Sequence, residues 1–182
     1  MKKFFFSFVL IAVFFVSCSV QAQDHRSDYR FESTLADPDS DGYFHSIKVN
    51  GYVANEKEPM FECEHELWGF VDANDAEETT WIYDWDINFD GTPDLVIFLW
   101  RNVAGRVSEY YAAYTWNTKQ NYFAQVDGFE EIANPELDPD TKTITSWERT
   151  DINEFTRQTY AWQKGKLVLI KETQGKIYED EE

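Results

Sequence analysis

The stretch from Asp86 to Asp94 places oxygen-bearing side chains at alternate positions and closes on a further carboxylate. Calcium takes about six to eight oxygen ligands, and one loop can supply them from positions 1, 3, 5, 7 and 9. Gly91 stands at position 6, where such a loop must turn sharply. The spacing predicts a Ca2+ site formed by the side chains of Asp86, Asn88, Asp90 and Asp94 and the backbone carbonyl of Thr92.

The loop differs from an EF-hand on its C-terminal side. Position 12 holds Ile97, where an EF-hand has a bidentate Glu that leads into a helix. Residues 95–100 form an apolar, β-branched and aromatic run, which predicts a buried strand. We therefore expect an ion loop flanked by strands. An Asp- and Asn-rich turn without a metal is the alternative, because these side chains form turns with the neighbouring backbone unaided.

The N-terminal segment has the layout of a secretory signal. A basic start at residues 1–3 precedes an apolar stretch at residues 4–16, and small residues follow at 20–22. This pattern predicts a signal peptide over residues 1–22, cleaved after Ala22, and a periplasmic or secreted protein. The apolar stretch is shorter than the roughly 20 residues that a membrane span needs. The alternative is a lipoprotein anchored to a membrane through Cys18.

The chain is strongly acidic, with a formal net charge of −18. Such a charge repels nucleic acid, because the phosphates carry the same sign. It favours a basic protein as partner, since opposite fields steer the encounter; acidity that only maintains solubility is the alternative. Cleavage after Ala22 leaves Cys63 as the single cysteine, so no internal disulfide is expected. We expect a bound calcium ion to stabilise the fold in its place.

Beyond the signal, short alternating runs separated by turn residues predict an all-β fold. We expect an antiparallel meander, propeller-like or barrel-like, with one short helical turn at residues 128–134. Tyr-Thr-Trp at 114–116 and Tyr-Ala-Trp at 160–162 form a weak repeat of the kind seen in propeller blades. The expected organisation is a flexible N-terminal segment at 23–42, a calcium-binding β domain at 43–174 and an acidic tail at 175–182.

Catalytic motifs are absent from the sequence. It holds no serine-nucleophile elbow, phosphate-binding loop or histidine–glutamate zinc motif. Cys63 and His65 are two residues apart on a predicted strand and so share a side, but they lack the further ligands of a zinc site. We therefore predict a protein that is not an enzyme.

Several segments together resemble a known family. They are residues 86–95, 109–111, 134–138, 142–146 and 160–169. They are similar to a family of small exported bacterial calcium-binding, propeller-like proteins that includes a periplasmic immunity protein against a secreted peptidoglycan hydrolase. The family is similar in architecture to periplasmic lysozyme inhibitors. The resemblance implies calcium at the five positions named above and an inhibitory loop between the last strands.

In this chain the corresponding loop covers residues 146–155. It lacks the paired glycines of the relatives and ends on Phe155 in place of Tyr. Trp147, Arg149 and Phe155 are the residues expected to contact the partner, since aromatic and Arg residues dominate binding hot spots. The expected partner is a basic peptidoglycan hydrolase or another exported protein. A carbohydrate- or cell-surface-binding module is the alternative, because seven Trp and ten Tyr could stack on sugar rings.

Overall fold

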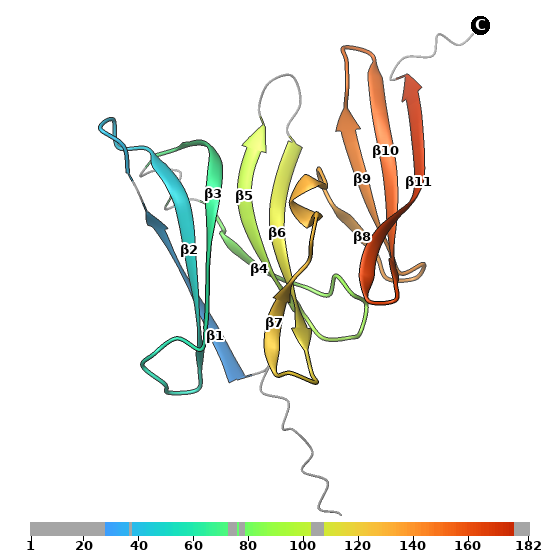
Figure 1. Cartoon of the computed structure of the whole chain (residues 1–182). Helices are drawn as coiled ribbons and strands as arrows, with labels where there is room; N and C mark the ends of the chain where they lie inside the picture. The colour runs from blue at the N-terminus through green and yellow to red at the C-terminus, as the bar shows by residue number, and fades with distance from the viewer. Residues whose placement is uncertain (1–27, 37, 73–75, 77–78, 103–107, 177–182) are drawn as a thin grey trace, which may run out of the picture.

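The computed structural model describes residues 28–36, 38–72, 76, 79–102 and 108–176, and these residues form three antiparallel sheets (Figure 1). Sheet A contains β1 (Tyr29–Ala36), β2 (Phe44–Val53) and β3 (Phe61–Val71). Sheet B contains β4 (Ile82–Trp85), β5 (Asp94–Asn102), β6 (Ser108–Asn117) and β7 (Tyr122–Gln125). Sheet C contains β8 (Glu136–Asp138), β9 (Thr143–Arg149), β10 (Glu154–Gln163) and β11 (Lys166–Lys176).

Within each sheet every strand pairs with its neighbours in the chain, so the prediction of an antiparallel meander is confirmed. Sheet B lies between sheets A and C, and the three sheets are splayed relative to one another (Figure 1). Within the described residues the sheets do not close on one another, which removes the barrel-like alternative. One turn of 3-10 helix, η2 (Phe129–Glu131), lies inside the segment predicted to form a helical turn.

The N-terminal segment at 23–42 is predicted to be flexible, and the structure corrects this for the part that it describes. Strand β1 pairs with β2 along its whole length. Tyr29 and Phe31 alternate toward the interior, where their rings lie 5.6 Å from Trp116 and 5.2 Å from Phe123 respectively. Arg30 and the polar residues at 32–34 are exposed, which is why the composition of this segment suggests a flexible one. At the other end, β11 continues to Lys176, past the boundary predicted at 174.

Sheet B holds the centre of the core. The run at 95–99 is buried throughout, as the apolar run predicts for a strand covered on both faces. The alternation in β6 predicts one buried face, but both are buried: Tyr111 is 4% exposed and Ala113 is inaccessible. On the second face aromatic rings from neighbouring strands of sheet B pack side by side, with the ring centroids of Trp85 and Phe98 4.8 Å and 5.5 Å from that of Tyr111.

Candidate functional site

The predicted ion loop connects β4 to β5, as its strand-like flanks indicated. Its backbone is left-handed at Phe89 (φ 57°) and Gly91 (φ 88°). The Asp86 carboxylate accepts the N–H groups of Asp90 at 3.1 Å and Gly91 at 2.9 Å. Asn88 Oδ1 also accepts the Asp90 N–H, at 2.9 Å, and Asp90 Oδ1 accepts the Thr92 N–H at 2.8 Å. The side chains at positions 1, 3 and 5 therefore fold around the same tight turn.

Asp94 closes the loop from its buried side. Its side chain is buried, at 2% exposure, and Oδ2 accepts the Ile87 N–H at 3.1 Å. Oδ1 accepts the Trp116 N–H of β6 at 3.4 Å. The carbonyl of Ile87 in turn accepts the indole N–H of Trp162 at 2.6 Å. One buried carboxylate and one indole thus join the loop to sheet B and to sheet C.

The donors of this loop are hard oxygens, which is the chemistry that calcium prefers. A carboxylate or carboxamide oxygen that accepts one N–H keeps a second lone pair, so the turn-forming bonds leave acceptor capacity for an ion. Within the described part of the chain, no group of three or more His, Cys, Asp and Glu side chains is arranged to hold a metal. The residues fit a calcium ion by donor type and order along the loop, and Ca2+ at Asp86, Asn88, Asp90, Thr92 and Asp94 stays a prediction.

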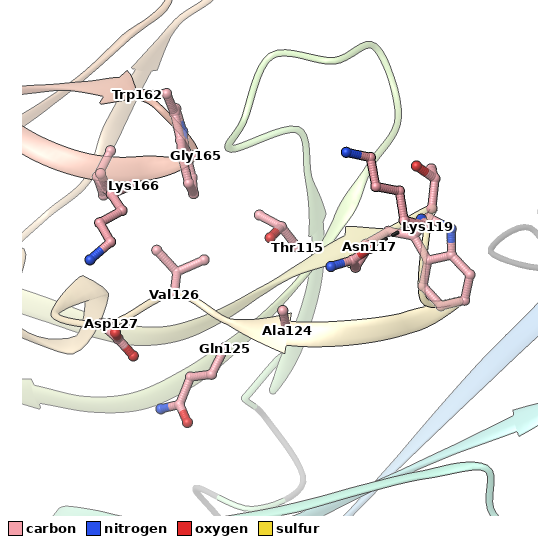
Figure 2. A pocket seen from close by; sticks show the side chains of 13 residues that line it. Thr115, Asn117, Lys119, Ala124, Gln125, Val126, Asp127, Trp162, Gly165 and Lys166 are labelled. Carbon is pink, nitrogen blue, oxygen red and sulfur yellow. Dashed lines mark hydrogen bonds between the residues drawn. The ribbon is translucent and has the colours of Figure 1, made fainter.

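An open groove of about 650 Å3 lies beside this loop, between β6–β7 and the β10–β11 hairpin (Figure 2). Trp162 and Lys166 line it from the hairpin, and Val126 points toward them from the segment after β7. Trp162 is held there by its bond to the Ile87 carbonyl. The lining is largely polar, with one half-buried indole, and such a surface is able to contact a sugar or a peptide.

The residues predicted to contact a partner are engaged within the protein. Trp147 and Phe155 stack on each other with centroids 5.9 Å apart, and Arg149 Nε donates to the Asp151 carbonyl at 2.8 Å. The Phe155 ring also covers Gly175 of β11, where an added Cβ would lie 2.5 Å from its Cζ.

Most of the predicted loop at 146–155 belongs to strands in the structure. Residues 146–149 belong to β9 and 154–155 to β10, which leaves only residues 150–153 as a turn. The segment implied to be an inhibitory loop therefore forms a hairpin with a four-residue turn, and an inhibitory role for it stays a prediction. Ile152 stands at its tip with 73% of its surface exposed.

Cys63 and His65 share a side of β3, but they do not form a catalytic pair. His65 Nε2 and the Tyr114 hydroxyl are hydrogen-bonded at 2.8 Å, and burial lowers the pKa of His65. Burial raises the pKa of the Cys63 thiol to about 11. Both side chains are therefore uncharged at neutral pH, and a protonated thiol is a poor nucleophile.

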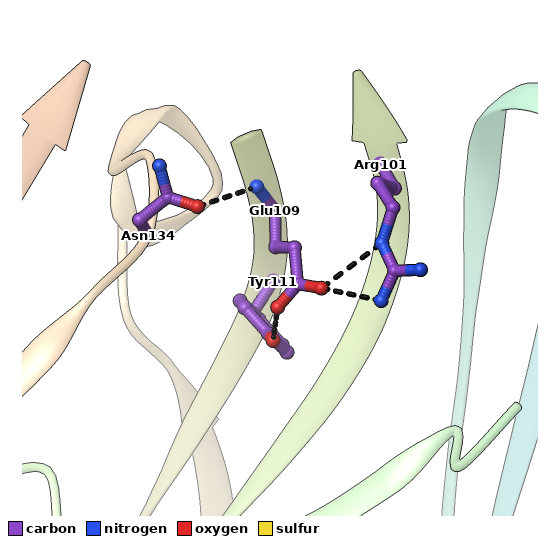
Figure 3. A network of polar contacts seen from close by, with 4 residues as sticks. All are labelled: Arg101, Glu109, Tyr111 and Asn134. Atoms are coloured by element: carbon purple, nitrogen blue, oxygen red, sulfur yellow. Dashed lines mark hydrogen bonds and ion pairs between the residues drawn. The ribbon is translucent and has the colours of Figure 1, made fainter. Parts of the chain in front are cut away.

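Residues 109–111 of β6 and Asn134, just before β8, meet between sheets B and C (Figure 3). The Glu109 carboxylate accepts hydrogen bonds from Arg101 Nη2 at 2.5 Å and from the Tyr111 hydroxyl at 2.8 Å. Asn134 Oδ1 accepts the backbone N–H of Glu109 at 2.9 Å, and Asn134 Nδ2 donates to the Trp147 carbonyl at 2.9 Å. Asn134 thus fastens β6 to β9 with both ends of one side chain.

Replacing Asn134 with Ala is expected to lower the free energy of unfolding by about 2–4 kcal/mol. Two part-buried hydrogen bonds are lost, and Ala is strained at φ 47°. Urea unfolding measures the loss. Asn121→Ala is the matched control, because Asn121 has φ 58° but is exposed, so it reports the backbone strain alone. Equal losses in the two variants would contradict the role of Asn134 between the sheets.

One surface feature was not found by sequence reasoning. Trp68 is 65% exposed at the end of β3, and its ring lies 6.0 Å from that of Trp100 on β5. The signal was present in the alternation of β3, which places Trp68 in series with three exposed glutamates, Glu62, Glu64 and Glu66. Its neighbour on β5 is set by the packing of two sheets, which no local pattern shows.

Comparison with known proteins gives one fold relative. No family model matches the sequence, and no curated protein matches it. A solved structure described as that of a Xanthomonas type IV secretion system related protein superposes with a TM-score of 0.54 at 17% identity. The match covers 81% of this chain and 78% of that one. At this identity the likeness establishes a shared fold.

The prediction of a signal peptide falls on residues 1–22, and Cys18 lies there too, outside the described residues. Among the residues that the structure does describe, none lies in a helix of the length and apolarity that a bilayer crossing requires.

Proposed function

We propose that this protein is an exported, calcium-stabilised binding domain that captures a basic protein, with a cell-wall hydrolase as the leading partner. The observation that carries the proposal is the separation of charge along the fold. Residues 28–127, which span sheets A and B, hold 20 of the 34 acidic residues against six Lys and Arg. Residues 143–176, which span β9 to β11, hold four acidic and six basic residues.

This separation predicts how a partner approaches. A concentrated negative field steers a basic protein toward sheets A and B and raises the association rate at low salt. The β9–β11 region lacks that field, so the turn at 150–153 is the less favourable surface for a basic partner. Ile152 at its tip remains available for an apolar contact at the edge of such an interface.

Binding in place of catalysis is supported by the use of the reactive side chains. Cys63 and His65 are both committed to Tyr114, on the inner side of β3. The description of the fold relative as a type IV secretion system related protein supports a place among exported proteins. The N-terminal pattern of the sequence supports the same location.

The test is a titration of residues 23–182 against a panel of basic lysozymes and amidases, with hydrolysis of peptidoglycan as the readout. We expect at least one hydrolase to lose its activity at a near-equimolar ratio. The association rate should fall steeply between low and physiological salt, because exposed charges are screened over about 8–10 Å. Retention of all hydrolase activities, with no binding in a pull-down, would contradict the proposal.

A carbohydrate-binding module is the second candidate, and the groove beside Trp162 is the observation that favours it (Figure 2). A half-buried indole flanked by amide and carboxylate groups is the kind of surface on which a sugar ring stacks. Retention of cell-wall glycan without hydrolase inhibition would favour this reading. Turnover of the glycan would instead make the protein an enzyme.

A further inference from the structure

A small pocket lies where β3 of sheet A passes β5 of sheet B, two strands that stand next to each other in Figure 1. Its volume is about 160 Å3, the liquid volume of about five waters. This is room for the head group of one side chain. The pocket is lined by His65, Glu66, Trp68, Leu99, Trp100 and Glu130.

The aromatic wall of the pocket is held in place before any ligand arrives. The Trp100 ring stacks on Tyr110 with centroids 4.8 Å apart and an interplanar angle of 6°. Tyr110 is fixed in turn, because its hydroxyl donates to Glu148 at 3.0 Å. The Trp68 ring lies next to the Trp100 ring, with centroids 6.0 Å apart, and 65% of the Trp68 surface is exposed. A largely exposed indole held in one place is a contact surface that costs little to order on binding.

Two polar atoms of the pocket lack a hydrogen-bond partner among the described residues. Glu130 Oε2 and Trp100 Nε1 are both buried, and neither has a hydrogen-bond partner among the described residues. His65 Nε2 is already bonded to Tyr114, and burial lowers the pKa of the His65 ring more than the nearby Glu130 charge raises it. A buried carboxylate oxygen without a donor is costly, so this position favours a cation that brings donors with it.

The charged and aromatic side chains around the pocket indicate the charge and the shape of its ligand. Glu62, Glu64 and Glu66 face solvent along the same strand, which disfavours phosphate, sulfate and other anions. A guanidinium combines a flat face that stacks on an indole with five N–H donors for carboxylates. An ammonium has no flat face, so it uses the Trp68 ring less well.

We propose that this pocket receives an arginine side chain of the basic partner, with its guanidinium stacked on Trp68 and hydrogen-bonded to Glu130. The inference rests on the proposed function, since it names the anchor by which sheets A and B hold a basic protein.

The experiment follows the indole N–H signals of residues 23–182 by NMR during titration with N-acetyl-arginine amide. The lysine analogue tests shape, and the citrulline analogue, a neutral near-isostere of arginine, tests charge. We expect saturable shifts of the Trp68 and Trp100 signals with arginine, about five- to tenfold weaker binding of lysine, and no binding of citrulline. Trp68→Ala and Glu130→Gln should each weaken arginine binding at least about tenfold. Tyr122→Ala, an exposed aromatic on β7 outside the pocket, should leave it unchanged, and Trp68 is exposed enough for its variant to fold.

Two results would overturn the inference. One is equal shifts with arginine and citrulline, or binding that persists in both pocket variants. The other is a response to an N-acetylglucosamine trimer in place of arginine, which would make the pocket a sugar site. A hydrolase that binds the wild type and Trp68→Ala equally would remove the pocket as an anchor while the proposed function stands. If no hydrolase binds, the proposed function fails, and the arginine titration judges the pocket by itself.

Discussion

Replacing Asp94 with Ala is expected to lower the free energy of unfolding by about 3–5 kcal/mol, the largest loss from any loop position. The carboxylate is 2% exposed and accepts the N–H groups of Ile87 and Trp116. Ala removes both acceptors and leaves two buried donors unsatisfied. The change also deletes the closing ligand of the predicted ion loop. Urea unfolding in the presence of EGTA isolates the hydrogen-bond part of this loss.

Two comparisons make the result specific. Asp94→Asn keeps the shape and one acceptor oxygen but turns an NH2 group toward a backbone donor, so an intermediate loss is expected. Asp138→Ala is the matched control, because Asp138 accepts the N–H groups of Asp140 and Thr141 in an exposed turn. Its loss should be much smaller, since water replaces the lost acceptor. Similar losses for Asp94→Ala and Asp138→Ala would show that burial of Asp94 is not what matters.

The sequence was most informative where the local pattern and the tertiary environment agree. The apolar run at 95–99 is buried as predicted, because β5 has covered faces on both sides. The turn of the β10–β11 hairpin falls on residues 163–165, a polar, Gly-containing stretch between two strand-like runs, and Lys164 and Gly165 adopt positive φ there. The ion loop lies between two strands, as the lack of a helical pattern after it indicated.

The misses come from contacts between sheets. Strand β1 is polar on its outer face and has the composition of a loose segment, but Tyr29 and Phe31 pack on rings of sheet B. Residues 60–71 have the pattern of two short strands, and they form the single strand β3. The three residues of β8 carry too little pattern to be recognised at all. The side-by-side placement of Trp68 and Trp100 depends on which strands become neighbours across sheets, and alternation does not encode that.

In the candidate site, too, some features follow from the local sequence and others depend on the fold. The order of oxygen donors along residues 86–94 is a property of the sequence, and the loop keeps that order in three dimensions. The partner residues at 147, 149 and 155 were chosen by type, and all three are half-buried and make contacts within the β9–β10 hairpin. Their contact with a partner stays a prediction, because residue type alone does not show which side chains a partner meets.

Calcium removal is expected to produce the second large effect. With free calcium at about 100 times its dissociation constant, a single site on the folded state adds about 2.7 kcal/mol of stability. For a domain of this size the gain corresponds to a rise in melting temperature of about 5–10 °C, lost on addition of EGTA. Three carboxylates, from Asp86, Asp90 and Asp94, lie in a nine-residue loop with a non-glycine residue at φ 57°. Without an ion they repel one another, and the loop has less to hold its strained backbone.

A comparison with magnesium and a pair of Asp→Asn variants show whether the stabilisation comes from calcium bound at this loop. Magnesium should raise the melting temperature less, because it demands a tighter octahedral shell than an irregular loop offers. Asp90→Asn should weaken the calcium response while its side chain can still accept the Thr92 N–H. Asp138→Asn, in a turn without the alternating donors, should leave the response unchanged. Melting temperatures that are identical in calcium and in EGTA, with no heat of calcium binding by calorimetry, would show that residues 86–94 form an Asx-stabilised turn that functions without a metal.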